Sequence, residues 1–309
     1  MKELLELDYS PIKKTQRGIH MKFEIITDSS ATLPKEIIVK FGIQVLSLSY
    51  FIDEEEFLSY ERGKENDLSY FYEKLRNKGN IRTSLVNTQA ALTLIEELLK
   101  EGKDVLYIGF SSGLSGTYQS VSLAMEDLKE SYPERRIVYM DSLAASLGEG
   151  LLVYEACKLR EEGKTIDEVF EWLETNKLHL CHWFSVDDLF FLKRGGRIST
   201  AAAVFGSALS VKPVMHVDNE GHLIVMSKAR GRKKAIQELA NHLFDTVENP
   251  EDQVMGISHA DCEEDAVYLK NMIMEKYKVK EFIIEPMEPV IASHTGPGCL
   301  ALFFFGKER

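Results

Sequence analysis

The sequence predicts an α/β protein of two domains, the first built on a mostly parallel sheet and the second on a mixed sheet. Through the first half, short apolar runs of the length of buried strands alternate with amphipathic helical patterns. In the second half a hairpin pattern joins the alternation. The chain has 309 residues, more than a single hydrophobic core usually holds, so we expect domains at 21–164 and 165–309.

Each element of the first half follows from an apolar run and the turn after it. A run that ends in Ser, Thr or Asp predicts a strand followed by a helix, because these side chains cap helix N-termini. Strands are expected at residues 22–27, 43–52, 105–110 and 136–140, with a charged loop at 53–66. Helices are expected at 67–78, at 88–100, from the turn after residue 110 to about 129, and up to about 163.

The second half is expected to start with a helix at Thr165. A strand at 178–185 leads to a short helix, a basic segment at 193–199 and a stretch of small residues at 200–210. A hairpin over 215–226 should turn at residues 219–221, where Asn and Gly favour a tight turn. The remaining elements are helices at 231–247 and 263–277 and strands at 254–259 and 281–285.

Residues 1–20 show no clear period. Met21 then opens a strand pattern that resembles a fresh protein start. We therefore expect residues 1–20 to be an extension outside the fold.

Composition limits the classes of partner. The net charge of -12 argues against nucleic acid or an anionic membrane surface, since both need clustered positive charge. The four cysteines form no C-x-x-C pair, so no zinc ribbon or redox motif is indicated. Because no run approaches eighteen apolar residues, we expect no stable membrane insertion. Lone thiols fit a reducing cytoplasm, and no metal or cofactor motif is indicated.

The turn after the 105–110 run is the richest in ligand-binding groups. Its hydroxyls include Ser111, Ser112 and Ser115, and its glycines Gly113 and Gly116 let a ligand approach the backbone. The helix that follows offers free N–H groups at its N-terminus, which favours an anion. The alternative interpretation is that these residues only form the turn and cap the helix.

Similar polar turns follow the other runs. Asp28 and Ser30 end the first strand, Thr83 and Ser84 precede a helix, and Ser142 follows the 136–140 strand. Because ligands in parallel sheets bind beyond the carboxyl ends of the strands, these turns should gather at one edge.

Two further segments carry candidate functional groups. His294 stands in a loop of small residues, where it either tethers the loop or donates a hydrogen bond to the same anion. Arg197 follows a Gly-Gly turn, where it is either a solvated helix end or a guanidinium presented to a partner. We interpret His179 and His182 as structural, because no third metal ligand accompanies them.

A serine hydrolase is the enzymatic alternative. Gly109, Ser111 and Gly113 satisfy the G-x-S-x-G pattern, and His294 lies later in the chain. Against this, residues 113–116 prolong the loop before the helix, and no oxyanion-hole segment precedes it. A binder of another carboxylate or of a phosphate ligand is the third hypothesis.

Several blocks together resemble the DegV family of bacterial fatty-acid-binding proteins. The resemblance runs from about residue 22 to the end of the chain. One departure is visible at residues 83–87, where Thr-Ser-Leu-Val-Asn replaces the usual Thr-Ser-Gln-Pro-Ser. The matching blocks are ITDSSATLP, FSSGLSGTYQS, MDSLAASLG, LKRGGRIS, SVKPVMHVDNEG, KARGRKKA and SHTGPG.

The resemblance implies a long-chain fatty acid buried between the two domains. The residues it would assign to the carboxylate are Thr83, Ser111, Ser112 and His294, with a supporting loop of Ser84, Ser115, Gly116 and Gly296. It further implies a non-catalytic carrier that presents the acyl carboxylate to a separate ATP-binding kinase subunit, which forms the acyl phosphate. By this analogy Arg197 would contact that partner.

Overall fold

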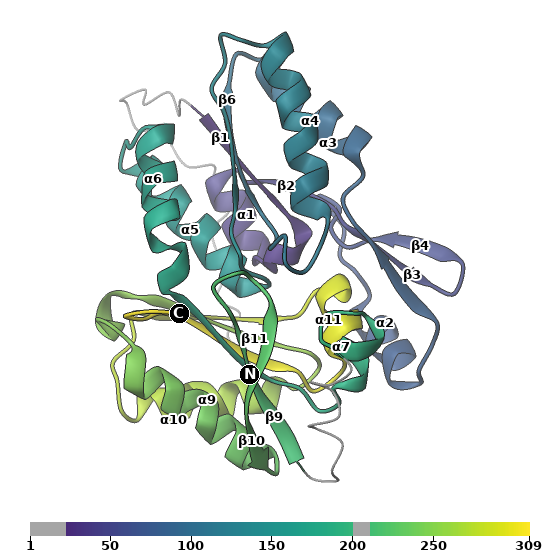
Figure 1. Cartoon of the computed structure of the whole chain (residues 1–309), viewed down its shortest axis with the longest axis vertical. Helices are drawn as coiled ribbons and strands as arrows, with labels where there is room; N and C mark the ends of the chain where they lie inside the picture. Colours follow the sequence, from purple (N-terminus) through teal and green to yellow (C-terminus); the bar gives the residue numbers. More distant parts are fainter. Residues whose placement is uncertain (1–22, 200–210) are drawn as a thin grey trace, which may run out of the picture.

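The computed structural model describes residues 23–199 and 211–309 (Figure 1). The expectations for residues 1–20 and for the small-residue stretch at 200–210 lie outside the described residues. The first sheet stands above the second in Figure 1, and a smaller sheet lies beside the first. None of the helices in the described part combines the length and apolar character that a membrane crossing needs.

The first sheet has four parallel strands in the order β2-β1-β6-β7. Every residue of β1 is buried, as expected for a parallel strand covered on both faces. Helices α3 and α4 cover one face, and α5 and α6 the other (Figure 1). The strands are β1 (Phe23–Asp28), β2 (Gln44–Leu46), β6 (Asp104–Gly109) and β7 (Ile137–Asp141). The helices of this half are α1 (Lys35–Phe41), α2 (Leu68–Arg76), α3 (Thr88–Lys100), α4 (Thr117–Ser131), α5 (Leu147–Glu161) and α6 (Ile166–Asn176), with a 3-10 turn η1 (Ser29–Ala31).

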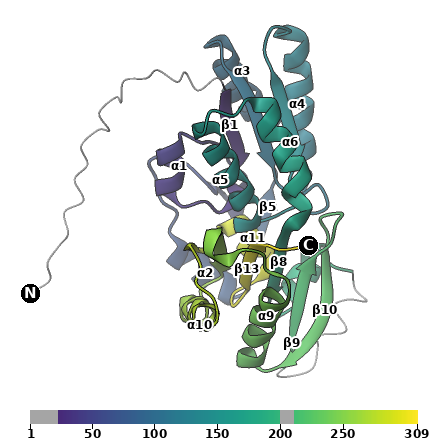
Figure 2. The same cartoon turned by 90° about the vertical axis from the view of Figure 1, so that its left-hand side faces the viewer.

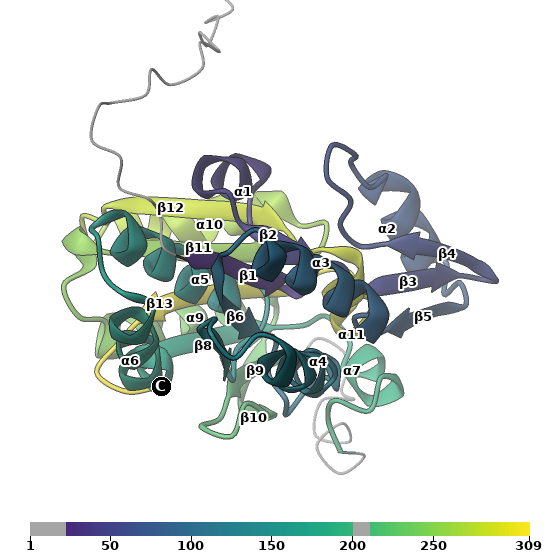
Figure 3. The ribbon, with the colours of Figure 1, turned by 90° about the horizontal axis from the view of Figure 1, so that it is seen from above.

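A three-stranded antiparallel sheet corrects the expectation for residues 43–66. The run 43–52 forms two strands in different sheets, β2 and β3 (Ser49–Ile52), and the expected charged loop contains β4 (Glu55–Leu58). The chain reverses at Asp53, whose φ of 56° suits a tight hairpin turn. The third strand, β5 (Ile81–Ser84), carries Thr83. Figure 3 shows this sheet projecting to one side of the first sheet.

The second sheet is mixed, with the order β10-β9-β8-β13-β11-β12. Only β11 and β12 pair in parallel among the described strands of this sheet. The predicted hairpin is confirmed as β9 (Val211–Val217) and β10 (Leu223–Arg230). The other strands are β8 (Leu180–Ser185), β11 (Val254–His259), β12 (Glu281–Pro286) and β13 (Leu300–Phe305). The helices are α7 (Phe190–Arg194), α9 (Arg232–Thr246), α10 (Glu263–Met274) and α11 (Pro289–Thr295), with 3-10 turns η2 (Lys177–His179) and η3 (Pro250–Asp252).

Helix α5 lies between the two main sheets (Figures 1 and 2). It contacts β1 and β6 on one side and β8, β11 and β13 on the other, and most of its residues are buried. Two glycines allow this double contact: a Cβ at Gly148 would overlap the His182 ring, and one at Gly150 would be 2.5 Å from the Ala31 carbonyl oxygen. The domain boundary predicted at 164 precedes α6, and α6 packs on β6 and β7 of the first sheet.

Candidate functional site

The polar turns after β1, β6 and β7 meet at one edge of the first sheet, as predicted. The Ser111 N–H donates to the Ala144 carbonyl over 3.0 Å, which joins the turn after β6 to that after β7. The Phe110 N–H donates over 3.1 Å to Asp28 at the end of β1. The turn after β1 also anchors α5, because the Ser30 hydroxyl lies 2.7 Å from Glu149 Oε2. Burial raises the pKa of Glu149 well above its usual value.

Between this edge and the inner face of the second sheet lies a cavity of about 310 Å³. This volume is at the lower end of the ~300–1,000 Å³ typical of small-molecule sites. Most of its lining is apolar. Phe110, Leu114 and Ala145 contribute from the first sheet's turns, and Phe184, Ala301 and Phe303 from the second sheet.

The polar part of the lining gathers residues from both halves of the chain. Thr83 comes from β5 and His294 from α11, and the Thr83 Oγ1 atom lies 2.9 Å from the His294 Nε2 atom. Ser84, Ser115, Gly116 and Arg197 also line the cavity. Of the predicted site residues, the structure therefore brings together Thr83, Ser84, Ser115, Gly116, Arg197 and His294.

His294 lies in the last turn of a helix, and not in the loop expected from the sequence. The helix begins because Pro289 suits a first helical position and the Glu288 carboxylate accepts hydrogen bonds from the Val290 and Ile291 N–H groups. Like His294, expected in the small-residue loop, Gly296 ends the helix with a φ of 78°. A side chain at Gly296 would overlap the Phe191 ring, and Gly296 does not line the cavity.

The imidazole of His294 is held neutral. Burial and, to a smaller extent, the charges of Arg197 and Arg194 together lower its pKa to about 4. Its Nδ1 atom is buried against Gly195 and has no hydrogen-bond partner among the described residues. A buried N–H without an acceptor is costly, so the single ring hydrogen is favoured on Nε2. That hydrogen then points at Thr83, and the Thr83 hydroxyl keeps its own hydrogen for a ligand.

Arg197 supplies the fixed positive charge of the cavity. Its Nε atom donates to the Leu114 carbonyl over 2.9 Å, and a second guanidinium nitrogen donates to the Gly195 carbonyl. Burial lowers its pKa from the usual value. Among the described residues that line the cavity, no other side chain carries a fixed charge. An anion is the ligand group that this end of the cavity favours.

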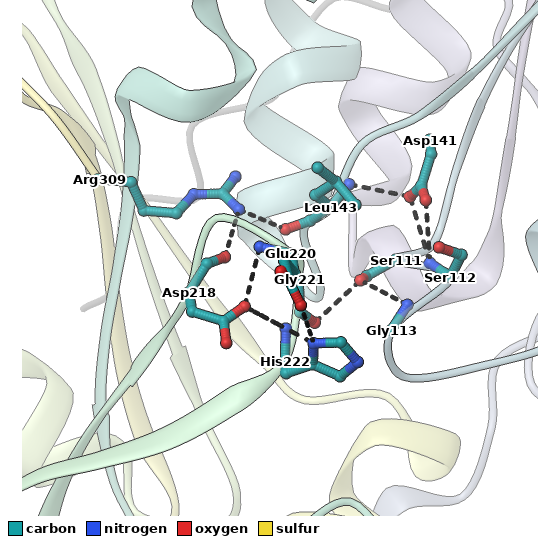
Figure 4. Close-up of polar contacts among 10 residues, drawn as sticks. All are labelled: Ser111, Ser112, Gly113, Asp141, Leu143, Asp218, Glu220, Gly221, His222 and Arg309. Atoms are coloured by element: carbon teal, nitrogen blue, oxygen red, sulfur yellow. Dashed lines mark hydrogen bonds and ion pairs between the residues drawn. The ribbon is translucent and has the colours of Figure 1, made fainter.

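Ser111 and Ser112 do not line the cavity; their polar contacts are drawn in Figure 4. The Ser111 side chain is fully buried, and its hydroxyl donates to the Gly221 carbonyl over 2.9 Å. Ser112 is exposed, and its backbone N–H donates to Asp141. The sequence correctly placed both serines directly after a strand. It did not predict that the Ser111 side chain points toward the second half of the molecule and that Ser112 faces solvent.

The same geometry leaves the hydrolase hypothesis without support. A serine nucleophile needs a hydrogen bond to its base and access to substrate. The Ser111 hydroxyl bonds to Gly221 instead, and the His294 Nε2 atom bonds to Thr83.

Two lining residues had other roles in the sequence interpretation. His182, expected to be structural, lines the cavity, and its Nδ1 atom bonds to the Leu180 carbonyl over 3.1 Å. Burial lowers the pKa of His182 well below its usual value. The Gly-Gly-Arg motif was a visible signal for Arg197, but the motif alone does not say whether the guanidinium points toward a partner or toward the cavity.

Comparisons with known proteins give one consistent result. The chain matches the sequence profile of the DegV family, described as uncharacterised, over residues 22–307. It is 47% identical to a DegV domain-containing protein of Clostridium perfringens, over 93% of this chain and 99% of that protein. A DegV family protein from Thermus thermophilus, solved in a study of its fatty acid binding, superposes with a TM-score of 0.83 at 30% identity, over 92% of this chain and 99% of that one. DegV from Bacillus subtilis, described as a fatty acid binding protein, gives a TM-score of 0.79 at 31% identity, over 93% and 100% of the two chains.

Proposed function

The chain belongs to the DegV family, and we propose that it binds a long-chain fatty acid in the cavity between its two main sheets. One observation carries the proposal: the cavity is apolar over most of its lining, and its polar part holds the Thr83–His294 pair beside the charge of Arg197. A fatty acid has the matching division into an apolar tail and one anionic group. The family relatives described as fatty acid binding support the same ligand class.

In this proposal the Thr83 hydroxyl donates to the carboxylate. His294 fixes that hydroxyl by donating to its oxygen, and the Arg197 charge stabilises the anion. Gly116 is the N-cap of α4, and no acceptor for its N–H lies among the described residues, so this N–H can assist, whereas the Ser115 N–H donates to the Ser111 carbonyl. A charge-assisted hydrogen bond contributes ~1.5–3 kcal/mol, whereas each buried CH₂ contributes ~0.8 kcal/mol, so the tail supplies most of the affinity.

Palmitate binding to a variant with a filled cavity tests the proposal. Ala301 is buried on β13 and lines the cavity, so Ala301→Phe places a ring in the space for the tail. We expect calorimetric titration to show palmitate binding to the wild type and at least a tenfold weaker affinity in Ala301→Phe. Ala90→Phe is the control, because Ala90 is exposed on α3. Equal affinities in the two variants, or acetate binding as tight as palmitate, would contradict the proposal.

We further propose that the protein is a non-catalytic carrier that presents the carboxylate to a separate ATP-dependent kinase subunit. The support is the family resemblance and the place of Arg197, which is partly exposed at the polar part of the cavity. Because the Arg197 charge also stabilises the anion, Arg197→Ala should weaken palmitate binding. At palmitate concentrations that saturate the variant, it should still abolish acyl phosphate formation in the presence of the kinase subunit. Acyl phosphate formation at the wild-type rate would remove Arg197 from the contact with that partner.

A further inference from the structure

The turn of the β9–β10 hairpin, residues 218–222, contacts the turn after β6, which carries Ser111 (Figure 4). The turn is rigid within itself, because the Asp218 carboxylate accepts hydrogen bonds from the Glu220 and His222 N–H groups, both over 2.9 Å. Its contact with the first sheet is the hydrogen bond from the Ser111 hydroxyl to the Gly221 carbonyl. Ser111 thus joins the two halves of the molecule.

Two glycines make this contact possible. A Cβ at Gly113 would lie 2.9 Å from the carbonyl oxygens of Glu220 and Gly221. A Cβ at Gly221 would overlap the Ser111 hydroxyl, and its φ of 80° favours glycine in any case. The two backbones therefore approach as closely as glycines allow.

Arg309 adds a second connection at the same turn. Its guanidinium donates to the Leu143 carbonyl over 2.7 Å and to the Asp218 carbonyl over 3.2 Å (Figure 4). Leu143 belongs to the turn after β7, and Asp218 begins the hairpin turn. Further hydrogen bonds to the Leu180 and Lys177 carbonyls hold the guanidinium in place.

The position of the hairpin turn matters to the cavity. Val217 and Leu223, the residues on either side of the turn, both line the cavity. Strand β10 is at the edge of the second sheet, is mostly exposed or half-buried, and has an irregular register between Val225 and Ser227. Among the described strands, only the outer edge of β10 is unpaired in this hairpin, and α9 packs against both of its strands, whereas α5 and α11 are packed between other elements. Among the described walls of the cavity, we infer that this hairpin, with its free outer edge, is the one that moves at least cost.

We propose that Ser111 and Arg309 form a clasp that holds the β9–β10 turn closed over the cavity, and that release of this clasp lets the acyl ligand enter and leave. Ser111 is then a positioning residue and makes no contact with the ligand. The inference rests on the proposed fatty acid binding. It predicts an effect on the rates of ligand exchange, with little effect on affinity, because entry and exit both pass through the open form.

The first test compares Ser111→Ala with its neighbour Ser112→Ala. Ser112 is exposed, and within the described residues only its backbone N–H is hydrogen-bonded. We expect Ser111→Ala to release palmitate to excess phosphatidylcholine vesicles about 2- to 10-fold faster than the wild type. This factor corresponds to the loss of one neutral hydrogen bond. Palmitate affinity should stay within about twofold, and Ser112→Ala should behave as the wild type. Equal release rates in the two variants would overturn the clasp.

A second measurement does not depend on the ligand. In the protein without palmitate, hydrogen exchange of the amides at residues 218–222 should be faster in Ser111→Ala and in Arg309→Gln than in Ser112→Ala. Unchanged exchange in both clasp variants would overturn the inference, whatever palmitate does. If the wild type binds no palmitate but exchange accelerates as expected, the clasp stands and the proposed ligand is wrong.

Discussion

At the scale of single residues, the site depends on which atom donates each hydrogen bond. A protonated His294 would donate from both ring nitrogens, and its buried Nδ1 would lack an acceptor among the described residues. The neutral ring avoids this cost and directs Nε2–H at Thr83. Gly195 contributes by its lack of a side chain, since a Cβ there would overlap the Nδ1 atom of His294. The Thr83 hydroxyl is thereby free to donate to a carboxylate.

Thr83→Val tests this donor. Valine keeps the shape and suits strand β5, so only the hydroxyl is lost. Because a hydrogen bond to a charged group is worth ~1.5–3 kcal/mol, palmitate affinity should fall about 10- to 100-fold in calorimetry. Thr88→Val is the matched control, because the Thr88 hydroxyl pairs with Ser120 away from the cavity. Equal affinities in the two valine variants would remove Thr83 from the carboxylate site.

The pKa of His294 predicts a pH dependence of stability. Its pKa falls from 6.5 to about 4 on folding, so between these values the unfolded chain binds a proton that the folded protein does not. The stabilisation from a neutral His294 is thus present above pH 6.5 and lost as the pH falls toward 4. The free energy of unfolding, measured with urea, should decrease between pH 7 and pH 4.5 in the wild type. In His294→Gln this decrease should be ~2–3 kcal/mol smaller.

The control for this measurement is Ser112→Ala, at an exposed side chain that carries no titratable group. It should follow the pH dependence of the wild type. If His294→Gln also does so, His294 is not held neutral by its surroundings.

Residue types were easier to predict than side-chain directions. The polar turns, Thr83 and His294 could be identified from local sequence. The direction of Ser111 could not, because its acceptor, Gly221, is 110 positions away in the sequence and belongs to the other sheet. The cavity position of Arg197 likewise depends on the Leu114 carbonyl of the first sheet's turn.

At the scale of elements, helix α5 joins the two sheets. Gly148 faces the second sheet and Gly150 the first, so the helix backbone lies close to both. Glu149 between them bonds to Thr27 and Ser30 of the first sheet. The sequence predicted a helix here, but not its burial on both sides, since burial depends on two sheets that are distant in sequence. For the same reason the small sheet was missed: residues 49–52 were expected in one strand with 43–48, and β4 and β5, which pair with β3, were not expected as strands.

A substitution at Gly148 tests the close approach of α5. Gly148→Ala adds a methyl group that overlaps the His182 ring, and such overpacking costs ~1–3 kcal/mol of unfolding free energy. Alanine is otherwise the better helix former, so without the contact the change would stabilise the protein.

The control is a double-mutant cycle with His182→Ala, measured by urea unfolding. Removing the ring should make Gly148→Ala cost at least ~1 kcal/mol less than in the wild-type background. Additive effects, or a stabilising Gly148→Ala, would contradict the contact.

At the scale of the whole molecule, the ligand site exists only because two sheets face each other. The first sheet supplies the turns at its carboxyl edge, and the small sheet supplies Thr83. The second sheet supplies the apolar floor, and helix α11 supplies His294. The alternation of strands and helices predicted both sheets and the edge where the turns meet. The volume and closure of the cavity could not be predicted, because they depend on how the sheets pack against α5 and on the hairpin that rests on Ser111.

Native mass spectrometry of the purified protein tests the central claim most directly, followed by denaturing release and identification of the bound molecule. We expect a mass excess that resolves into a fatty acid in the wild type, and an empty protein for Ala301→Phe. A wild-type protein that is empty as purified, and stays empty after incubation with palmitate and oleate, would contradict the claim that this cavity holds a fatty acid.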